Sequence, residues 1–208
     1  MPWKSPCGPM DKDHIDTTNR PLPTPNPDGD WIRLLVIVLE EINDDFIELK
    51  RLYYLDKQGK SQSNPCGHLD SDFQHLIGFP TADSTWINNP AELNANFLEI
   101  LDDYQKLASI LVFVEQIVWE NDTVGDRNDR DYLCNIYRKI KDALCEIRSH
   151  SQKTLINKVT PTRNAMHLEY RLIDNRTTRF QRNYIIFKDA SRYLRAISSK
   201  YIRLYFQS

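Results

Sequence analysis

The sequence predicts an all-α fold: a long-chain four-helix bundle, up-up-down-down, with two long crossover loops. In four long stretches, apolar residues recur at three- and four-residue steps, which is the spacing of one helix face. The connections between these stretches are long, short and long. A short link makes neighbouring helices antiparallel, whereas a long link can return the chain to the end where it started.

Composition narrows the class of protein. A chain of 208 residues is enough for one ordinary domain, and a hydrophobic fraction of 40% is typical of a folded chain. The formal charge of −2 argues against a nucleic-acid binder that works by neutralising phosphates. The longest apolar run, Leu107 to Trp119, contains Glu115 and is shorter than the roughly 20 residues of a bilayer span. We expect a soluble protein without membrane insertion.

The two ends are expected to lie outside the bundle, which we place at residues 30–203. Residues 1–29 are predicted to form an irregular arm, because prolines recur throughout and exclude a helix. The opening residues lack the apolar region of a secretory signal, so we interpret Met1 as a start placed on a mature sequence. Residues 204–208, LYFQS, resemble the remnant of a protease-cleavable tag.

The first helix is predicted from Asp30 to Leu55, and the chain then crosses over through residues 57–88. Its inward stripe is Trp31, Leu34, Leu35, Val38, Ile42, Phe46, Leu49 and Tyr53. Prolines and glycines interrupt residues 57–88, apart from a short turn expected near Asp70–Leu76. A connection of this length can travel the height of a bundle.

The second and third helices are joined by a short polar link. Residues 89–92, Asn-Pro-Ala-Glu, start the second helix with a capping Asn, a first-turn Pro and a Glu at the capping-box position. This helix is expected to end near Asn121, and the third to cover residues 129–149. The expected core positions of the two helices are Leu93, Phe97, Leu101, Tyr104, Leu107, Leu111, Val114, Val118, Leu133, Ile136, Ile140, Leu144 and Ile147.

A second irregular crossover, residues 151–178, is expected before the closing helix, residues 179–203. Thr177 and Thr178 are its candidate caps, and Phe180 lies in its first turn. The apolar face of this helix carries Tyr184, Phe187, Ala190, Leu194, Ile197 and Tyr201. The opposite, solvent-facing side is expected to carry Lys188, Asp189, Arg192, Arg195 and Lys200.

Four cysteines are consistent with two disulfides in an oxidising compartment. Cys134 and Cys145 are about 16 Å apart on one helix and cannot pair with each other. The topology places the arm's Cys7 near Cys145 and places Cys66 near Cys134, so those two bonds are predicted. The alternative is four reduced, buried thiols. Two N-glycosylation sequons, at Asn121 and Asn175 in predicted loops, also favour a secreted, extracellular protein.

Several segments resemble the interleukin-6 family of helical cytokines, on its ciliary neurotrophic factor and cardiotrophin-like branch. They are the tyrosine-rich YYLDKQG of residues 53–59, the HLDSDFQHLIGFP of residues 68–80, the lone Trp86, and the AELNANFLEILDDYQKL of residues 91–107. In the last helix Phe180 matches the aromatic of the family's Phe-x-x-Lys receptor motif. The resemblance implies a growth-factor-like cytokine that assembles class I cytokine receptors, including the family's shared signal-transducing receptor, and so triggers JAK/STAT signalling.

The resemblance also implies a set of receptor contacts. Asn183 stands where the family has Lys, so the role of that lysine is expected to have moved to Arg182 or Arg179. The cysteine pattern also differs from that of ciliary neurotrophic factor. The candidate receptor-binding residues are Phe180, Asn183, Arg179, Arg182, Trp86, Arg192 and Arg195.

Catalysis has weaker support in the sequence. Glu41 with Asp44, and Glu99 with Asp102, have the spacing of the acidic pairs that hold Mg²⁺ in all-α nucleotide pyrophosphatases, but a solvated helix face explains them as well. The Cys and His residues near position 66 fit no standard zinc site. We therefore predict no enzyme and no cofactor; the alternatives are such a pyrophosphatase or a purely structural helical bundle.

Overall fold

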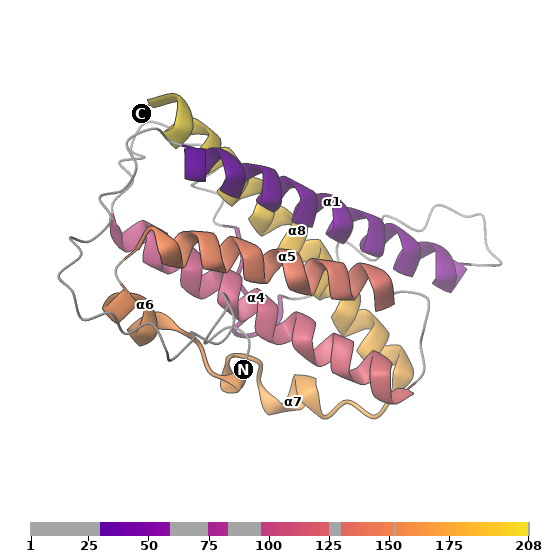
Figure 1. Ribbon diagram of the computed structural model, residues 1–208. Coiled ribbons are helices and arrows are strands. Elements are labelled where there is room, and N and C mark those ends of the chain that lie inside the picture. Colours follow the sequence, from indigo (N-terminus) through magenta and orange to yellow (C-terminus); the bar gives the residue numbers. More distant parts are fainter. Residues whose placement is uncertain (1–29, 59–74, 83–96, 125–129, 152, 208) are drawn as a thin grey trace.

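The computed structural model describes residues 30–58, 75–82, 97–124, 130–151 and 153–207, and all regular structure in these residues is helical. The predicted all-α class is therefore confirmed. Four long helices lie side by side (Figure 1): α1 (Asp30–Gln58), α4 (Phe97–Val124), α5 (Arg130–Ser149) and α8 (Arg176–Gln207). Three short elements precede α8: α6 (Lys153–Val159), η3 (Arg163–Ala165) and α7 (Leu168–Arg171).

Aromatic contacts at both ends of α1 fix its direction relative to α8. Trp31, near the start of α1, packs edge-on against Tyr201 near the end of α8, with ring centroids 6.4 Å apart. Tyr53, near the end of α1, stacks on Phe180 near the start of α8, with centroids 4.6 Å apart. The two helices are therefore antiparallel over most of their length.

Ion pairs at both ends of α4 fix its direction in the same way. Lys200 of α8 donates to Asp103 early in α4 at 2.8 Å, and Arg182 early in α8 is paired with Glu120 late in α4. Helix α4 is therefore also antiparallel to α8. It packs on α5 as well, and only residues 125–129 separate those two helices.

The core lies between the four long helices, and most predicted core positions are buried in it. Helix α4 is enclosed on every side through residues 107–114, which explains why its apolar residues are less strictly periodic than those of α5. The fully buried side chains include Leu35, Leu39, Ile42, Phe46, Leu49, Tyr104, Leu107, Leu111, Phe113, Leu133, Ile136, Ile140, Leu144, Phe187, Tyr193, Leu194, Ile197 and Tyr201.

In α1, two side chains differ from the prediction. Leu34 was expected in the core but is 55% exposed, whereas Leu39, outside the predicted stripe, is fully buried. Leu35, Leu39 and Ile42 recur at helical spacing on a single line that faces the interior, and Leu34 lies beside that line. The sequence alone could not tell which of the neighbours Leu34 and Leu35 is buried, because that depends on where α5 and α8 pack.

The predicted solvent face of α8 is only half correct. Arg192 and Arg195 are exposed as expected, but Lys188, Asp189 and Lys200 are buried. Lys200 is turned inward by its ion pair with α4, and the Asp189 carboxylate is bonded at 2.8 Å by the ring of His75 in the first crossover.

The second crossover is also more regular than predicted. Its residues 151–178 contain α6, η3 and α7. In the first crossover the described turn lies at Leu76–Phe79, where the Phe79 N–H donates to the Leu76 carbonyl at 3.0 Å. The predicted start of the second helix and the arm of residues 1–29 lie outside the described residues.

The helix ends extend slightly past the predicted ones. Helix α1 continues to Gln58, α4 to Val124, and α8 to Gln207, with Leu204 buried. The sequon at Asn121 was predicted to lie in a loop, but it lies within α4. None of the described helices combines the length and the hydrophobicity needed to cross a bilayer.

Candidate functional site

The start of α8 is where the resemblance placed the receptor contact. The cap is Asn175: its side-chain oxygen accepts the Thr178 N–H at 3.1 Å, so the predicted caps Thr177 and Thr178 lie inside the first turn. The first turn of α8 holds no acidic residue and carries Arg176 and Arg179. Their charge adds to the positive end of the helix dipole, so this end of the bundle attracts negative groups.

Phe180 was predicted to project beyond the packed region, but its side chain is half-buried. Its ring stacks on Tyr53, and Tyr53 in turn meets Phe187 edge-on at 4.9 Å. Phe180 is thus the outermost ring of a row that continues into the core. One part of the ring is still available to a partner, but the residue also stabilises the contact between α1 and α8.

Arg182 and Asn183 are buried, which contradicts their predicted role in direct receptor binding. The Arg182 side chain is 2% exposed and binds both carboxylate oxygens of Glu120, one of them at 2.9 Å. It also donates to the Tyr170 carbonyl at 2.6 Å and to the Asn183 side-chain oxygen at 2.9 Å. Asn183 donates to the Tyr53 hydroxyl at 3.3 Å. Both residues therefore act inside the protein, joining α1, α4, α7 and α8.

The other predicted contacts are spread over the surface. Arg179 is half-buried in the first turn of α8, and Arg192 and Arg195 are exposed on its second half. Trp86 lies outside the described residues. The structure thus brings Arg179 and Phe180 together and places the other two arginines farther along the same helix.

Beside this end of α8 the two crossovers touch each other; we call this contact, between Leu76–Phe79 and Arg163–Leu172, the crossover junction. The Ile77 N–H donates to the Tyr170 hydroxyl at 3.2 Å. Gly78 has φ 81°, and a Cβ there would lie 2.6 Å from the Ala165 carbonyl oxygen, so only glycine fits. The junction is therefore a close backbone contact.

Polar side chains of α4 hold the junction against the bundle. Gln116 donates to the Arg171 carbonyl at 3.3 Å and accepts from Arg163 at 3.3 Å. Together with the bond from Arg182 to Tyr170, these contacts leave the carbonyl side of α7 facing inward. Sequence reasoning missed this junction, and its only signal was a glycine between apolar residues in the first crossover.

Three large aliphatic side chains near the junction are exposed: Ile77 at 59%, Leu168 at 58% and Leu172 at 69%. We did not predict a role for them from the sequence. Leu168 and Leu172 are four residues apart, which was the available signal, but the surrounding stretch was classified as irregular.

The acidic pairs considered for metal binding are occupied by lysines. Lys139 contacts Glu41 at 3.2 Å, Lys106 contacts Asp102 at 2.7 Å, and Lys200 contacts Glu99 at 3.0 Å. Across the described residues, no three His, Cys, Asp or Glu side chains are grouped so that they could hold a metal ion. Glu41, Glu99 and Asp102 thus form ion pairs with lysines and give no support to the pyrophosphatase alternative.

Asp103 is a buried carboxyl group that faces α8. Burial raises the pKa of its carboxyl, although the charge of Lys200 opposes the shift. Lys200 is shared with Glu99, so protonation of Asp103 would still leave the ammonium with one carboxylate. The arrangement is a closed ionic cluster between α4 and α8.

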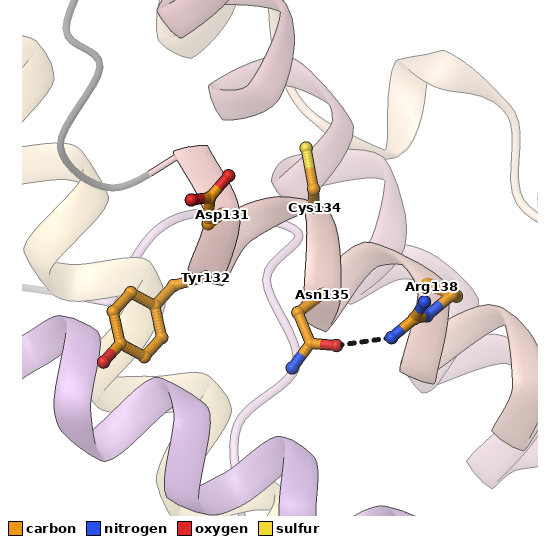
Figure 2. A pocket seen from close by; sticks show the side chains of 5 residues that line it. All are labelled: Asp131, Tyr132, Cys134, Asn135 and Arg138. Carbon is orange, nitrogen blue, oxygen red and sulfur yellow. Dashed lines mark hydrogen bonds between the residues drawn. The ribbon is translucent and has the colours of Figure 1, made fainter.

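The cysteines differ from the predicted pairing. Cys134 is a free, exposed thiol that lines a surface pocket with Asp131, Tyr132, Asn135 and Arg138 (Figure 2), so the predicted Cys66–Cys134 bond is not formed. Cys134 lies in an early turn of α5, on the exposed face of that helix. Within the described structure, no second sulfur is bonded to it. Among the described residues that line this pocket there is no histidine, so none of them offers the thiol an imidazole base.

Cys145 is disulfide-bonded, and its partner lies outside the described residues, so the Cys7–Cys145 bond stays a prediction. The stack of Trp31 on His150 places Cys145 close to the start of α1, about 33 Å along the bundle from Gln58 at 1.5 Å per residue. The eight residues from Gln58 to Cys66 span at most about 29 Å when fully extended. The Cα atoms of a disulfide lie about 4.4–6.8 Å apart, which extends the reach of Cys66 to about 33–36 Å, so chain length does not separate Cys66 from Cys7 as the partner.

Comparisons of this chain with protein-family models, with curated proteins and with solved structures give no match.

Proposed function

We propose that this chain is a secreted cytokine of the interleukin-6 type, which assembles class I cytokine receptors and so activates receptor-associated kinases and STAT proteins. The fold that goes with this proposal is a long-chain four-helix bundle with up-up-down-down topology. The observation that carries it is the pairing of helix directions: α8 is antiparallel to both α1 and α4. With a long connection between α1 and α4, this pairing is the one that two crossover loops produce.

A cytokine that joins receptor chains needs two separate surfaces, and α8 offers both. Arg179 and Phe180 lie at its start, and Arg192 and Arg195 lie on its second half. Phe180 and Arg195 are fifteen residues apart, or about 22 Å along the helix. This separation lets two receptor domains bind without competing for the same residues.

Charge and an aromatic side chain suit the first surface for protein binding. Arginine and aromatic residues are enriched among the side chains that dominate interface energies. At the start of α8 a half-buried phenyl ring stands beside two arginines, and the Tyr53 stack holds the ring in one orientation. A ring fixed in this way loses little conformational freedom on binding.

The test is a signalling experiment on cells that carry interleukin-6-type receptors. The purified protein is added over a range of concentrations, and STAT phosphorylation is measured with and without a JAK inhibitor. We expect a saturable, inhibitor-sensitive response that is weakened in Arg179→Ala. No response in cells that answer control cytokines would overturn the proposal. Mg²⁺-dependent nucleotide hydrolysis that is lost in Glu99→Ala would replace it with the pyrophosphatase alternative.

A further inference from the structure

Asn175, the cap of α8, is also the first residue of the sequon Asn175-Arg176-Thr177. All three residues are exposed, at the point where the chain leaves α7 and enters α8. An oligosaccharide attached to this sequon extends into water and displaces no packed side chain. The folded structure therefore has room for a modification here.

The Asn175 side-chain amide uses only its oxygen to stabilise the protein. Oδ1 accepts the Thr178 N–H at 3.1 Å, and the Asn175 backbone carbonyl accepts the Arg179 N–H at 3.0 Å. Within the described part of the chain, nothing is bonded to the amide nitrogen Nδ2. N-glycosylation joins a sugar to this nitrogen and leaves the oxygen in place, so the cap and a glycan are compatible.

We infer that Asn175 carries an N-linked glycan and caps α8 through the same amide. The donor is a lipid-linked oligosaccharyl pyrophosphate. The bond between the sugar carbon C1 and its phosphate oxygen breaks and a C1–Nδ2 bond forms; the lipid pyrophosphate leaves, and Nδ2 loses one proton to the solvent. The inference rests on the proposed function, because only a chain that enters the secretory route meets this donor.

The position of the cap determines which part of α8 lies beside the glycan. Arg179 is four residues beyond Asn175, about 6 Å along the helix and roughly 40° around it, whereas Phe180 is turned by roughly 140°. The first sugar therefore stands next to Arg179 and on a different side of the helix from the Phe180 ring. The glycan restricts the approach to Arg179 from that side and leaves Phe180 uncovered.

The first experiment maps the glycan and separates it from the cap. The full chain is secreted from mammalian cells behind a cleavable leader, and its peptides are analysed by mass spectrometry before and after treatment with a peptide N-glycosidase. Asn175→Asp keeps an oxygen cap but loses the acceptor nitrogen, Thr177→Val keeps the cap but loses the sequon hydroxyl, and Asn175→Ala loses both functions.

We expect a glycan on Asn175 of the wild-type chain and none at that position in the three variants. Because a lost cap costs about 1 kcal/mol, the melting temperature of Asn175→Ala should lie roughly 2–4 °C below those of the two variants that keep the cap.

The second experiment measures the access to Arg179. A dicarbonyl reagent that modifies arginine is added to the glycosylated wild-type chain and to Thr177→Val, and the rate at each arginine is followed by mass spectrometry. We expect modification of Arg179 to be roughly threefold slower in the glycosylated chain, because the bulky glycan stands beside it. Arg195, exposed and about 30 Å from Asn175 along α8, is the internal control and should react equally in both.

Each part of the inference has a result that would overturn it. A secreted wild-type chain with unmodified Asn175, or with a glycan only at Asn121, overturns the modification and leaves the proposed function standing. Equal melting temperatures of Asn175→Ala and Asn175→Asp remove the role as a cap, and equal rates at Arg179 remove the shielding. Absence of receptor activation by both the glycosylated and the deglycosylated chain refutes the proposed function, whereas the mapped glycan stands.

Discussion

Replacing Arg182 by methionine is expected to destabilise the protein more than any change at an exposed site. The guanidinium is 2% exposed and binds Glu120, the Tyr170 carbonyl and Asn183. Arg182→Met leaves the Glu120 carboxylate buried without its cation, and removing one partner of a buried pair costs about 3–5 kcal/mol. For a chain of this size, each kcal/mol lowers the melting temperature by roughly 2–4 °C, so we expect a fall of roughly 6–20 °C.

A double variant separates the ion pair from simple loss of packing. In Glu120→Met/Arg182→Met no buried charge remains, and Met is similar in length to Glu but shorter than Arg. We therefore expect most of the lost free energy of unfolding to return, although the Tyr170 carbonyl still lacks its donor.

The assay is urea unfolding followed by circular dichroism, together with hydrogen exchange of residues 163–172. Faster exchange in that segment is expected in Arg182→Met, because the segment loses its link to α8. A loss below about 1 kcal/mol, or a double variant less stable than Arg182→Met, would refute the reasoning.

Three further predictions concern other parts of the chain. Phe180→Ala should lower the free energy of unfolding by about 2 kcal/mol in a denaturant titration, because the ring is half-buried against Tyr53; a loss below about 0.5 kcal/mol would show that the stack contributes little. Peptide mapping without reduction should link Cys145 to Cys7 and find Cys134 free; a Cys66–Cys145 peptide would contradict the predicted pairing. Because burial raises the pKa of Asp103, its contribution to stability is fully present below the unfolded-state pKa and is lost as pH rises through the raised folded-state value. Asp103→Asn should remove this part of the pH dependence of unfolding, and an identical profile in both proteins would argue against it.

Periodicity was sufficient to find the four long helices because each buries a continuous stripe. The core of α5, from Leu133 to Ile147, follows helical spacing and was predicted except for Ala143. The residues that typically begin and end helices predicted the ends of α1 and α5 to within a few residues of those in the structure. The pattern could not supply the contact of each helix with its neighbours. For that reason the exposed Leu34 was predicted to lie in the core, and the buried Leu39 was left out of the predicted core.

Charged residues were the main source of error at the candidate site. An arginine or lysine on a helix is normally solvated, so Arg182 and Lys200 were placed outside. Each is buried because a carboxylate far away in sequence meets it: Glu120 and Asp103 on α4. Such pairs have no local signature and require the three-dimensional arrangement of α4 and α8.

Leu168, which begins α7, and Leu172, which follows it, are exposed and illustrate the opposite problem. A short turn of four residues carries too little periodicity to distinguish a helix from a loop. Its orientation depends on the buried Arg182 and Gln116, which bond its carbonyls. The two leucines were therefore not selected from the sequence, although their four-residue spacing was present in it.

Equilibrium binding to purified receptor ectodomains tests the central claim most directly. The wild-type chain is passed over immobilised ectodomains of class I cytokine receptors, with the shared interleukin-6-type signal-transducing receptor among them, and thermally unfolded protein serves as the control. The proposed function predicts saturable binding that weakens in Arg179→Ala and at high ionic strength, because basic residues flank the contact. Absence of saturable binding to every ectodomain, by a chain shown to be folded by circular dichroism, would contradict it.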